Sequence, residues 1–223
     1  MKICAISDLH GYLPEIKECD LLTICGDVVP LSVQRNYIKS EDWIYNVFSN
    51  WVKNLPCDKV ILIAGNHDFY FDNCPLIKVN LLEWTKGKCL YLENELYKYL
   101  DYKIYGTPYT HLFGNWAFMY EDDKLIEFYK SIPNDIDILL THDTPAIANL
   151  DELPPSRWSS VPIHAGNNPL AEAIKEKKPR YVFCGHLHQC TDKYAKVDNT
   201  KIYNVSLLDN QYNITYKPLY LDI

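Results

Sequence analysis

Residues 61–68 read Ile61-Leu62-Ile63-Ala64-Gly65-Asn66-His67-Asp68 and join a short apolar run to a cluster of polar side chains. The run is too short for a helix, so we expect a buried strand that carries functional groups at its carboxyl end. Neighbouring side chains of an extended backbone point to opposite sides, so Asn66 could reach a cation while His67 faces a substrate. Glycine and asparagine also favour turns, so this stretch alone could be a simple loop.

The composition is typical of one globular α/β domain, and we expect residues 1–223 to form a single domain. The hydrophobic content is 48% and the net charge is −7. An acidic chain is poorly suited to long nucleic acids, whose binding depends on lysine and arginine side chains that neutralise phosphates. Small anionic substrates stay compatible with this charge, because bound divalent cations can reverse the local field.

The eight cysteines are scattered without a Cys-x-x-Cys pair, and several lie in apolar runs, where cysteine behaves as a small buried hydrophobe. The first apolar run ends at Asp8 and is too short for a signal peptide. No stretch approaches the roughly 18 apolar residues of a membrane span. We therefore expect a cytoplasmic protein without a membrane segment, and the oligomeric state stays open.

Apolar runs alternate with amphipathic segments over most of the chain, a pattern that predicts an α/β fold. Strands are expected at 2–7, 20–25, 59–64, 96–97, 103–105, 136–140 and 180–184. Helices are expected at 32–54 (with Ser40 a possible internal start), 75–85 (with proline in its first turn), 122–131 and 168–178. An aromatic loop is expected at 109–120 and a proline-rich loop at 153–163, and short strands with turns follow Thr191.

Five of these strands end in side chains that can bind a metal: Asp8-x-His10, Asp27, Asn66-His67, His142 and His186-x-His188. Oxygen and imidazole donors without thiolate suit divalent cations such as Mn²⁺, our first choice, with Fe²⁺, Zn²⁺, Co²⁺ or Ni²⁺ as alternatives. The i, i+2 spacing places both side chains of a pair on one face if the backbone is extended. If His67 faces a substrate, seven ligands remain. They complete two four-ligand sites only if one ligand is shared. Asp27 is the natural bridge, because a carboxylate has two oxygens.

A single histidine of this kind is more often structural than a metal ligand. Five such groups, each directly after an apolar strand, are harder to explain by packing, because burying many unpaired polar side chains is costly. The sequence therefore favours a metal centre at the strand ends.

In this order, Asp-x-His, Gly-Asp, Gly-Asn-His-Asp, Thr-His and Gly-His-x-His resemble the motifs of the calcineurin-like metallophosphoesterase superfamily, over about residues 1–190. The resemblance implies a four-layer α/β/β/α sandwich of two mixed sheets, with two metal ions at the carboxyl ends of the strands. It makes His67 the catalytic histidine that contacts the phosphate, and Asp68 the residue that orients it. It assigns one ion to Asp8, His10, Asp27 and His188, and the other to Asp27, Asn66, His142 and His186.

Further segments resemble the branch of metallophosphoesterase-domain proteins, whose members hydrolyse cyclic nucleotides and other phosphodiesters. Among them are Asn54-Leu55-Pro56, Trp116-Ala117-Phe118 and Ile202-Tyr203-Asn204-Val205-Ser206. The implied reaction is attack by a hydroxide that bridges the two metals, with His67 assisting the leaving oxygen. Asp143 departs from the pattern of these relatives, in which glycine and proline usually follow the histidine.

We interpret the sequence as that of a metal-dependent phosphodiesterase for small phosphoesters, with phosphomonoesterase, nuclease and non-catalytic binding protein as alternatives. A diester is favoured because a cluster of carboxylates would make the pocket acidic, and the only arginine near the expected lid is Arg157. The carboxylates in question are those of Asp8, Asp27, Asp68 and Asp143.

Substrate contacts are expected from Asn66, His67, His111 and His164. His164 lies just before an expected helix start, where it could meet phosphate or serve a local packing role. His111 could equally be an exposed loop residue. Trp116 and Phe118 could stack on a base, although core burial is the simpler interpretation.

Overall fold

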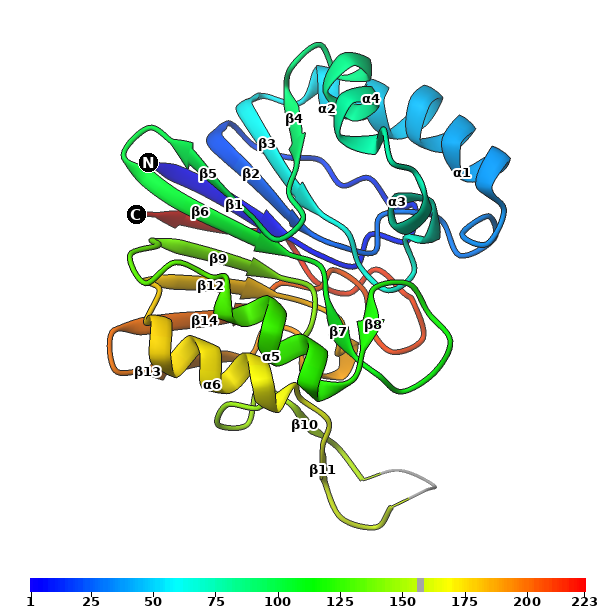
Figure 1. Ribbon diagram of the computed structural model, residues 1–223. Coiled ribbons are helices and arrows are strands. Elements are labelled where there is room, and N and C mark those ends of the chain that lie inside the picture. Colours follow the sequence, from blue (N-terminus) through cyan, green and yellow to red (C-terminus); the bar gives the residue numbers. More distant parts are fainter. Residues whose placement is uncertain (156–158) are drawn as a thin grey trace.

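A computed structural model describes residues 1–155 and 159–223, and its two β-sheets pack face to face (Figure 1). The first sheet has the order β15 (Leu219–Asp222), β1 (Lys2–Ile6), β2 (Cys19–Cys25), β3 (Cys57–Ile63) and β4 (Cys89–Tyr91). The second has the order β13 (Tyr194–Val197), β14 (Thr200–Asn204), β12 (Tyr181–Cys184), β9 (Ile138–Thr141), β6 (Tyr102–Thr107) and β5 (Glu95–Tyr99). Both sheets are mixed, because β15, β13 and β5 run antiparallel to otherwise parallel neighbours.

Helices cover both outer faces of this pair of sheets (Figure 1). The first sheet is covered by α1 (Tyr37–Trp43), α2 (Ser49–Asn54) and α4 (Ile77–Trp84), and the short α3 (Phe69–Asn73) follows β3. The second is covered by α5 (Asp122–Lys130) and α6 (Asn168–Lys177). The four-layer α/β/β/α sandwich implied by the sequence is confirmed. None of the described helices is long and apolar enough to cross a bilayer.

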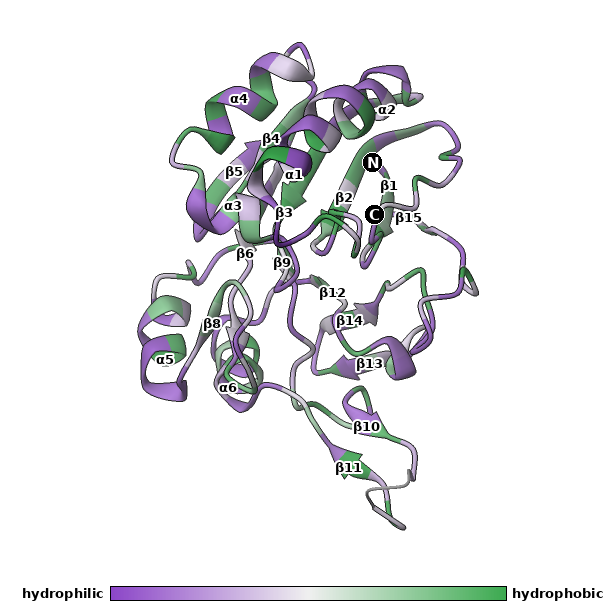
Figure 2. Ribbon diagram, turned by 90° about the vertical axis from the view of Figure 1, so that its right-hand side faces the viewer, coloured by the Kyte–Doolittle hydropathy of each residue, from purple (hydrophilic) through white to green (hydrophobic). Residues whose placement is uncertain are grey.

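Two pairs of very short strands lie outside the main sheets. β7 (Thr110–His111) pairs with β8 (Met119–Tyr120) within the expected aromatic loop. β10 (Glu152–Leu153) pairs with β11 (Ile163–His164) and closes the base of the expected proline-rich loop. The hairpin built on β10 and β11 extends away from the sandwich in Figure 2, which looks onto the right-hand side of Figure 1.

Burial on both faces explains why the strands read as continuous apolar runs. In β3, Ile61 and Ile63 point into the layer between the sheets, where they meet side chains such as Phe183 of β12. The intervening Val60 and Leu62 pack beneath the helices, which carry hydrophobic and hydrophilic residues on different sides (Figure 2). All four β3 side chains are completely buried, and burial of one such aliphatic side chain contributes about 1.5–3 kcal/mol.

The helix expected at 32–54 starts later and is not uniform. The side chain of Asn36 accepts a hydrogen bond from the backbone N–H of Lys39 at 3.1 Å, so α1 begins at Tyr37 and the proposed start at Ser40 is wrong. A π-helical turn, Ile44–Phe48, then joins α1 to α2. The helix expected at 75–85 is also shorter. Leu76 occupies the N-cap position without a side-chain hydrogen bond, and Pro75 precedes the first turn instead of lying within it.

The carboxyl ends of the parallel strands meet at one side of the sandwich, where the two sheets contact each other directly. The backbone N–H of Ser7, after β1, donates to the carbonyl oxygen of Val205, after β14, at 2.9 Å. Nδ1 of His142, after β9, lies 2.7 Å from the carbonyl oxygen of Cys25 at the end of β2. These bonds hold the loops that carry the predicted ligands in one place.

Candidate metal centre

Four of the predicted ligands have a left-handed backbone: Asp8 (φ 56°), His10 (φ 41°), Asp27 (φ 55°) and His186 (φ 69°). The extended geometry expected for the two i, i+2 pairs is therefore wrong. β1 already ends at Ile6, and His188–Cys190 form a short 3₁₀ helix. Residues with a side chain adopt positive φ only at an energetic cost, which proteins retain mostly at functional sites. Here the sharp turns bring the side chains together.

One cluster of donors consists of Asp8, His10 and His188. Nε2 of His188 lies 3.1 Å from Oδ1 of Asp8, while its Nδ1 lies 2.9 Å from the carbonyl oxygen of Asp209. The hydroxyl of Ser206 donates to Oδ2 of Asp8 at 2.6 Å. The carbonyl and the hydroxyl hold the imidazole and the carboxylate in position for a shared ligand.

A second cluster contains Asp27, Asn66 and His142. Oδ2 of Asp27 lies 3.4 Å from Nε2 of His142 and 3.5 Å from Nε2 of His10, so Asp27 lies between the two clusters. Oδ1 of Asn66 lies 3.0 Å from Nε2 of His142. The ring centroid of His186 is 5.1 Å from that of His142, at the edge of this group. All seven predicted ligands therefore gather in one place.

Two glycines let the chain approach these donors closely. A Cβ atom at Gly65 would lie 2.6 Å from the ring of His142 and would collide with the carboxylate of Asp27. A Cβ atom at Gly185 would collide with the side chains of Ser7 and Asp8. The absence of a side chain at both positions is what allows the two clusters to form next to backbone.

The environment of the His10 ring indicates that a cation fits the first cluster. Its side chain is only 2% exposed, yet neither ring nitrogen has a hydrogen-bond partner among the described residues. The 3.5 Å between Nε2 and the carboxylate of Asp27 is too long for a good hydrogen bond. A buried, unpaired imidazole nitrogen is costly, and a divalent cation beside the carboxylate would satisfy both groups.

His142 leads to the same conclusion for the second cluster. Because its Nδ1 donates to the carbonyl of Cys25, Nε2 is the ring nitrogen that faces the oxygens of Asn66 and Asp27. Burial lowers the pKa of His142, but Asp27 outweighs this effect and the pKa is raised to about 10. In the same way, burial opposes protonation of His188, yet the carboxylate of Asp8 raises its pKa to about 9. Both clusters attract positive charge, and their donors fit a divalent metal.

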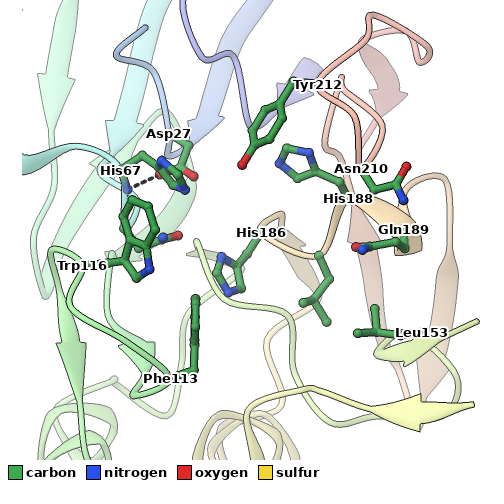
Figure 3. Close-up of a pocket in the computed structure, with 12 residues that line it drawn as sticks. Asp27, His67, Phe113, Trp116, Leu153, His186, His188, Gln189, Asn210 and Tyr212 are labelled. Atoms are coloured by element: carbon green, nitrogen blue, oxygen red, sulfur yellow. Dashed lines mark hydrogen bonds between the residues drawn. The ribbon is translucent and has the colours of Figure 1, made fainter. Parts of the chain in front are cut away.

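His67 lies beside the donors but has partners of its own. Its backbone N–H donates to Oδ1 of Asp27 at 2.8 Å (Figure 3), and its Nδ1 lies 2.5 Å from Oε1 of Gln34. The ring packs on Trp116 with a centroid distance of 4.4 Å. His67 also forms a possible donor group with His10 and Asp27, so the geometry alone permits a ligand role as well as the catalytic role that the resemblance implies.

The expectation that Asp68 orients His67 is wrong. Asp68 is completely buried, and its carboxylate accepts hydrogen bonds from the backbone N–H groups of Gly65 at 2.9 Å and of Val28 and Val29 at 3.0 Å. It therefore connects the loop after β3 to the loop after β2. The side chain that forms a hydrogen bond with the His67 ring is that of Gln34.

Asp143 and His111 form a pair behind the second cluster. Oδ2 of Asp143 lies 2.8 Å from Nδ1 of His111 and also accepts the backbone N–H of His111 at 2.9 Å. Asp143 is completely buried, and the ring centroid of His111 is 6.3 Å from that of His186. His111 thus supports the wall that carries His186, and it is not among the described residues that line the pocket. With Asp68 and Asp143 both enclosed by protein, the strongly acidic pocket expected from four carboxylates is wrong.

His164 does not reach the pocket. It lies on β11 with a side chain that is 58% exposed, and its Nδ1 lies 3.0 Å from Oδ1 of Asp151. The start of α6 is capped instead by Asn167, whose side chain accepts the backbone N–H of Leu170 at 2.8 Å. His164 pairs with Asp151 outside the pocket, and the substrate contact expected from it has no support in this geometry.

A pocket of about 320 Å³ opens onto the donors (Figure 3). Trp116 and Phe113 form one wall, Leu153 and Gln189 lie opposite, and Tyr212 closes a third side. Of the described residues that line it, Asp27 is the only carboxylate. The full lining is Asp27, Asn66, His67, Phe113, Trp116, Leu153, His186, Leu187, His188, Gln189, Asn210 and Tyr212.

Several residues at this site were not predicted from the sequence. Gln34 and Tyr212 lie in segments without a recognisable motif, so no local signal pointed to them. Of the two aromatic candidates, Trp116 lines the pocket whereas Phe118 is 2% exposed and belongs to the core. Arg157, considered as a lid residue, lies outside the described residues.

The chain is similar to several known proteins. The sequence profile of calcineurin-like phosphoesterases matches residues 1–190. The whole chain aligns with a UPF0046 protein of Caenorhabditis elegans at 29% identity (81% of that protein) and with human metallophosphoesterase domain-containing protein 1 at 26% identity (71% of that protein).

Two solved structures share the fold. A protein of Thermus thermophilus has a TM-score of 0.61 at 15% identity, covering 99% of this chain and 98% of that one. Phosphopantetheinyl hydrolase of Mycobacterium tuberculosis has a TM-score of 0.59 at 15% identity, covering 95% and 90%. Since the profile match extends from the first strand to the last predicted ligand pair, the chain belongs to the calcineurin-like phosphoesterase family.

Proposed function

We propose that this protein is a metal-dependent phosphodiesterase that hydrolyses small phosphodiesters, with cyclic nucleotides as the leading substrate class. The observation that carries the proposal is the position of Asp27. Its carboxylate lies between His10 and His142 on the floor of a pocket whose walls are largely aromatic and aliphatic. Such a floor suits a phosphoryl group, and such walls suit the organic groups of an ester.

The proposal assigns the donors to two divalent ions, with Mn²⁺ as the first choice. When bound, the ions would supply Lewis-acid stabilisation of the phosphoryl charge and a water of lowered pKa. Asp27 would be the donor that both ions share, because its carboxylate lies between His10 and His142. One ion would be completed by Asp8, His10 and His188, and the other by Asn66, His142 and His186.

His67 would assist the leaving oxygen from the edge of the pocket. Gln34 accepts a hydrogen bond from Nδ1, so Nε2 would face the substrate and would donate a proton to the leaving oxygen when the ring is an imidazolium. Trp116 packs along the ring and limits its rotation. A histidine held at both its nitrogen and its face is prepared for proton transfer or hydrogen bonding at a fixed position.

Replacing Gln34 with alanine should lower kcat about tenfold while leaving the metal content unchanged, because the ring of His67 loses the acceptor that orients it. Gln34→Glu keeps an acceptor at the same place and should retain more of the activity than Gln34→Ala. The measurement is kcat together with metal analysis of both variants. An unchanged kcat in Gln34→Ala would show that this contact does not matter for turnover.

The pocket walls favour a diester over a monoester. The second organic group of a diester would pack against Phe113 and Trp116, whereas the additional negative charge of a monoester would face neutral side chains such as Gln189 and Asn210. Burial of such a group is worth about 1–3 kcal/mol in discrimination. The expected preference for a diester over a monoester thus rests on the apolar walls of the pocket and not on the number of carboxylates in it.

The test is kcat/KM for bis-p-nitrophenyl phosphate against p-nitrophenyl phosphate with Mn²⁺ at neutral pH, since both release the same leaving group. We expect the diester to be at least about tenfold better, and hydrolysis of 2′,3′- and 3′,5′-cyclic nucleotides should follow the same metal dependence. A preference for the monoester would identify a phosphomonoesterase, and hydrolysis of long nucleic acids alone would identify a nuclease. Metal binding without any hydrolysis would indicate a non-catalytic binding protein.

A further inference from the structure

The loop from Ser206 to Tyr212 contacts each member of the first donor cluster, although it lies beyond the part of the chain that matches the family profile. The hydroxyl of Ser206 donates to Asp8, and the carbonyl of Asp209 lies 2.9 Å from Nδ1 of His188. The ring of Tyr212 meets His10 edge to face, with a centroid distance of 4.9 Å, and lies 5.2 Å from the ring of His188. The loop is therefore built onto the metal donors.

The internal hydrogen bonds of this loop fix the direction of Tyr212. The carboxylate of Asp209 accepts the backbone N–H groups of Gln211 at 2.8 Å and Asn213 at 2.9 Å, and the carbonyl of Asp209 accepts that of Tyr212 at 2.9 Å. Tyr212 itself has φ 62°, a left-handed conformation that is unfavourable for a bulky side chain. The surrounding bonds compensate for this cost and hold the ring against His10.

The hydroxyl of Tyr212 projects into the pocket, toward the side occupied by Asp27 and His67, and faces the wall formed by Trp116 (Figure 3). The side chain lines the pocket and the residue is 42% exposed, so it is not a core residue whose hydroxyl faces away from the ligand. A phenol with a pKa near 10 is protonated at neutral pH and can donate one hydrogen bond. The position is suited to a donor toward an anion held on the pocket floor.

We propose that Tyr212 is a further catalytic residue, whose hydroxyl donates a hydrogen bond to a phosphoryl oxygen of the bound ester. The inference rests on the proposed function and extends it to one residue that no motif indicated. The negative charge on the phosphoryl oxygens is redistributed during the reaction. A fixed hydrogen-bond donor that points at the oxygen where charge develops stabilises the transition state and lowers the barrier. A neutral donor also suits a diester, which carries a single negative charge.

The experiment uses the full chain with Mn²⁺ and compares wild type with Tyr212→Phe, which keeps the ring against His10 and removes only the hydroxyl. The dissociation constant for inorganic phosphate, measured by calorimetry, should rise about tenfold, because a hydrogen bond to a charged group is lost. The kcat/KM for bis-p-nitrophenyl phosphate should fall about 10²-fold, and the manganese content should stay the same. Tyr194→Phe, at an exposed tyrosine on β13, is the matched control and should change neither quantity.

Unchanged phosphate binding in Tyr212→Phe with manganese retained would overturn the assignment, and so would wild-type protein that binds no phosphate. Loss of manganese in the variant would also overturn it, because Tyr212 would then act by supporting His10 and His188. Wild-type protein that binds phosphate but hydrolyses no diester would instead reject the proposed function. In that case the phosphate constants of the two proteins still decide whether the hydroxyl of Tyr212 contacts the anion.

Discussion

Replacing Asp27 with alanine should abolish hydrolysis, with kcat/KM reduced by at least about 10⁴-fold, because the substitution removes the one donor that both proposed ions share. Oδ2 of Asp27 is 3.5 Å from Nε2 of His10 and 3.4 Å from Nε2 of His142, so this carboxylate lies between the two rings. The backbone N–H of His67 also loses its acceptor, Oδ1. Metal analysis should find that binding of both ions is weakened.

Two further variants separate loss of metal from loss of fold. Asp27→Asn keeps an oxygen for the N–H of His67 but removes the negative charge, so it should fold normally and still bind metal poorly. Asp101→Ala, at an exposed carboxylate in the turn between β5 and β6, should behave as wild type in turnover and metal content. An Asp27→Ala protein with two tightly bound ions and near-normal turnover would refute the bridging assignment.

Replacing His67 with alanine should leave the metal content intact and reduce kcat by about 10²–10⁴-fold, the usual contribution of a positioned acid or base. The ring of His67 is fixed by Gln34 and Trp116, and neither of these belongs to the proposed ligand set. The loss should be larger for a phenyl ester than for a p-nitrophenyl ester, because a poor leaving group depends more on assistance at its oxygen.

The alternative for His67 is a ligand role, which its proximity to His10 and Asp27 permits. Metal analysis distinguishes the two roles of His67, because replacing a metal ligand lowers the metal content, whereas replacing a catalytic residue lowers only the rate. A His67→Ala protein with a reduced metal content would move His67 into the ligand set. A defect that is equal for both leaving groups would contradict leaving-group assistance. Tyr194→Phe, at an exposed tyrosine on β13 outside the pocket, is the control and should change neither the metal content nor the activity.

The α/β class and the strand-end position of the candidate ligands could be predicted from the sequence pattern, and the resemblance to the family added the four layers. Uninterrupted apolar runs such as residues 59–64 encode strands that are buried on both faces, and this property depends on local composition. In parallel sheets, the residues that follow such strands meet at one edge whatever the details of the loops. Asp27 and Asn66, which follow the neighbouring strands β2 and β3, could therefore be expected to approach each other although they lie far apart in the chain.

The orientation of these side chains and the neighbours that support them could not be predicted from the sequence. The left-handed turns at Asp8 and His186 replaced the expected extended pairs, because the loops must bend sharply where the two sheets meet. Asp68 binds backbone amides, and Gln34 took over the contact with His67. Such contacts join loops that are remote in sequence and carry no periodic signal. These contacts depend on how the layers pack against each other. The packing sets the distances between loop side chains to within a few ångströms and so determines which of them form a hydrogen bond.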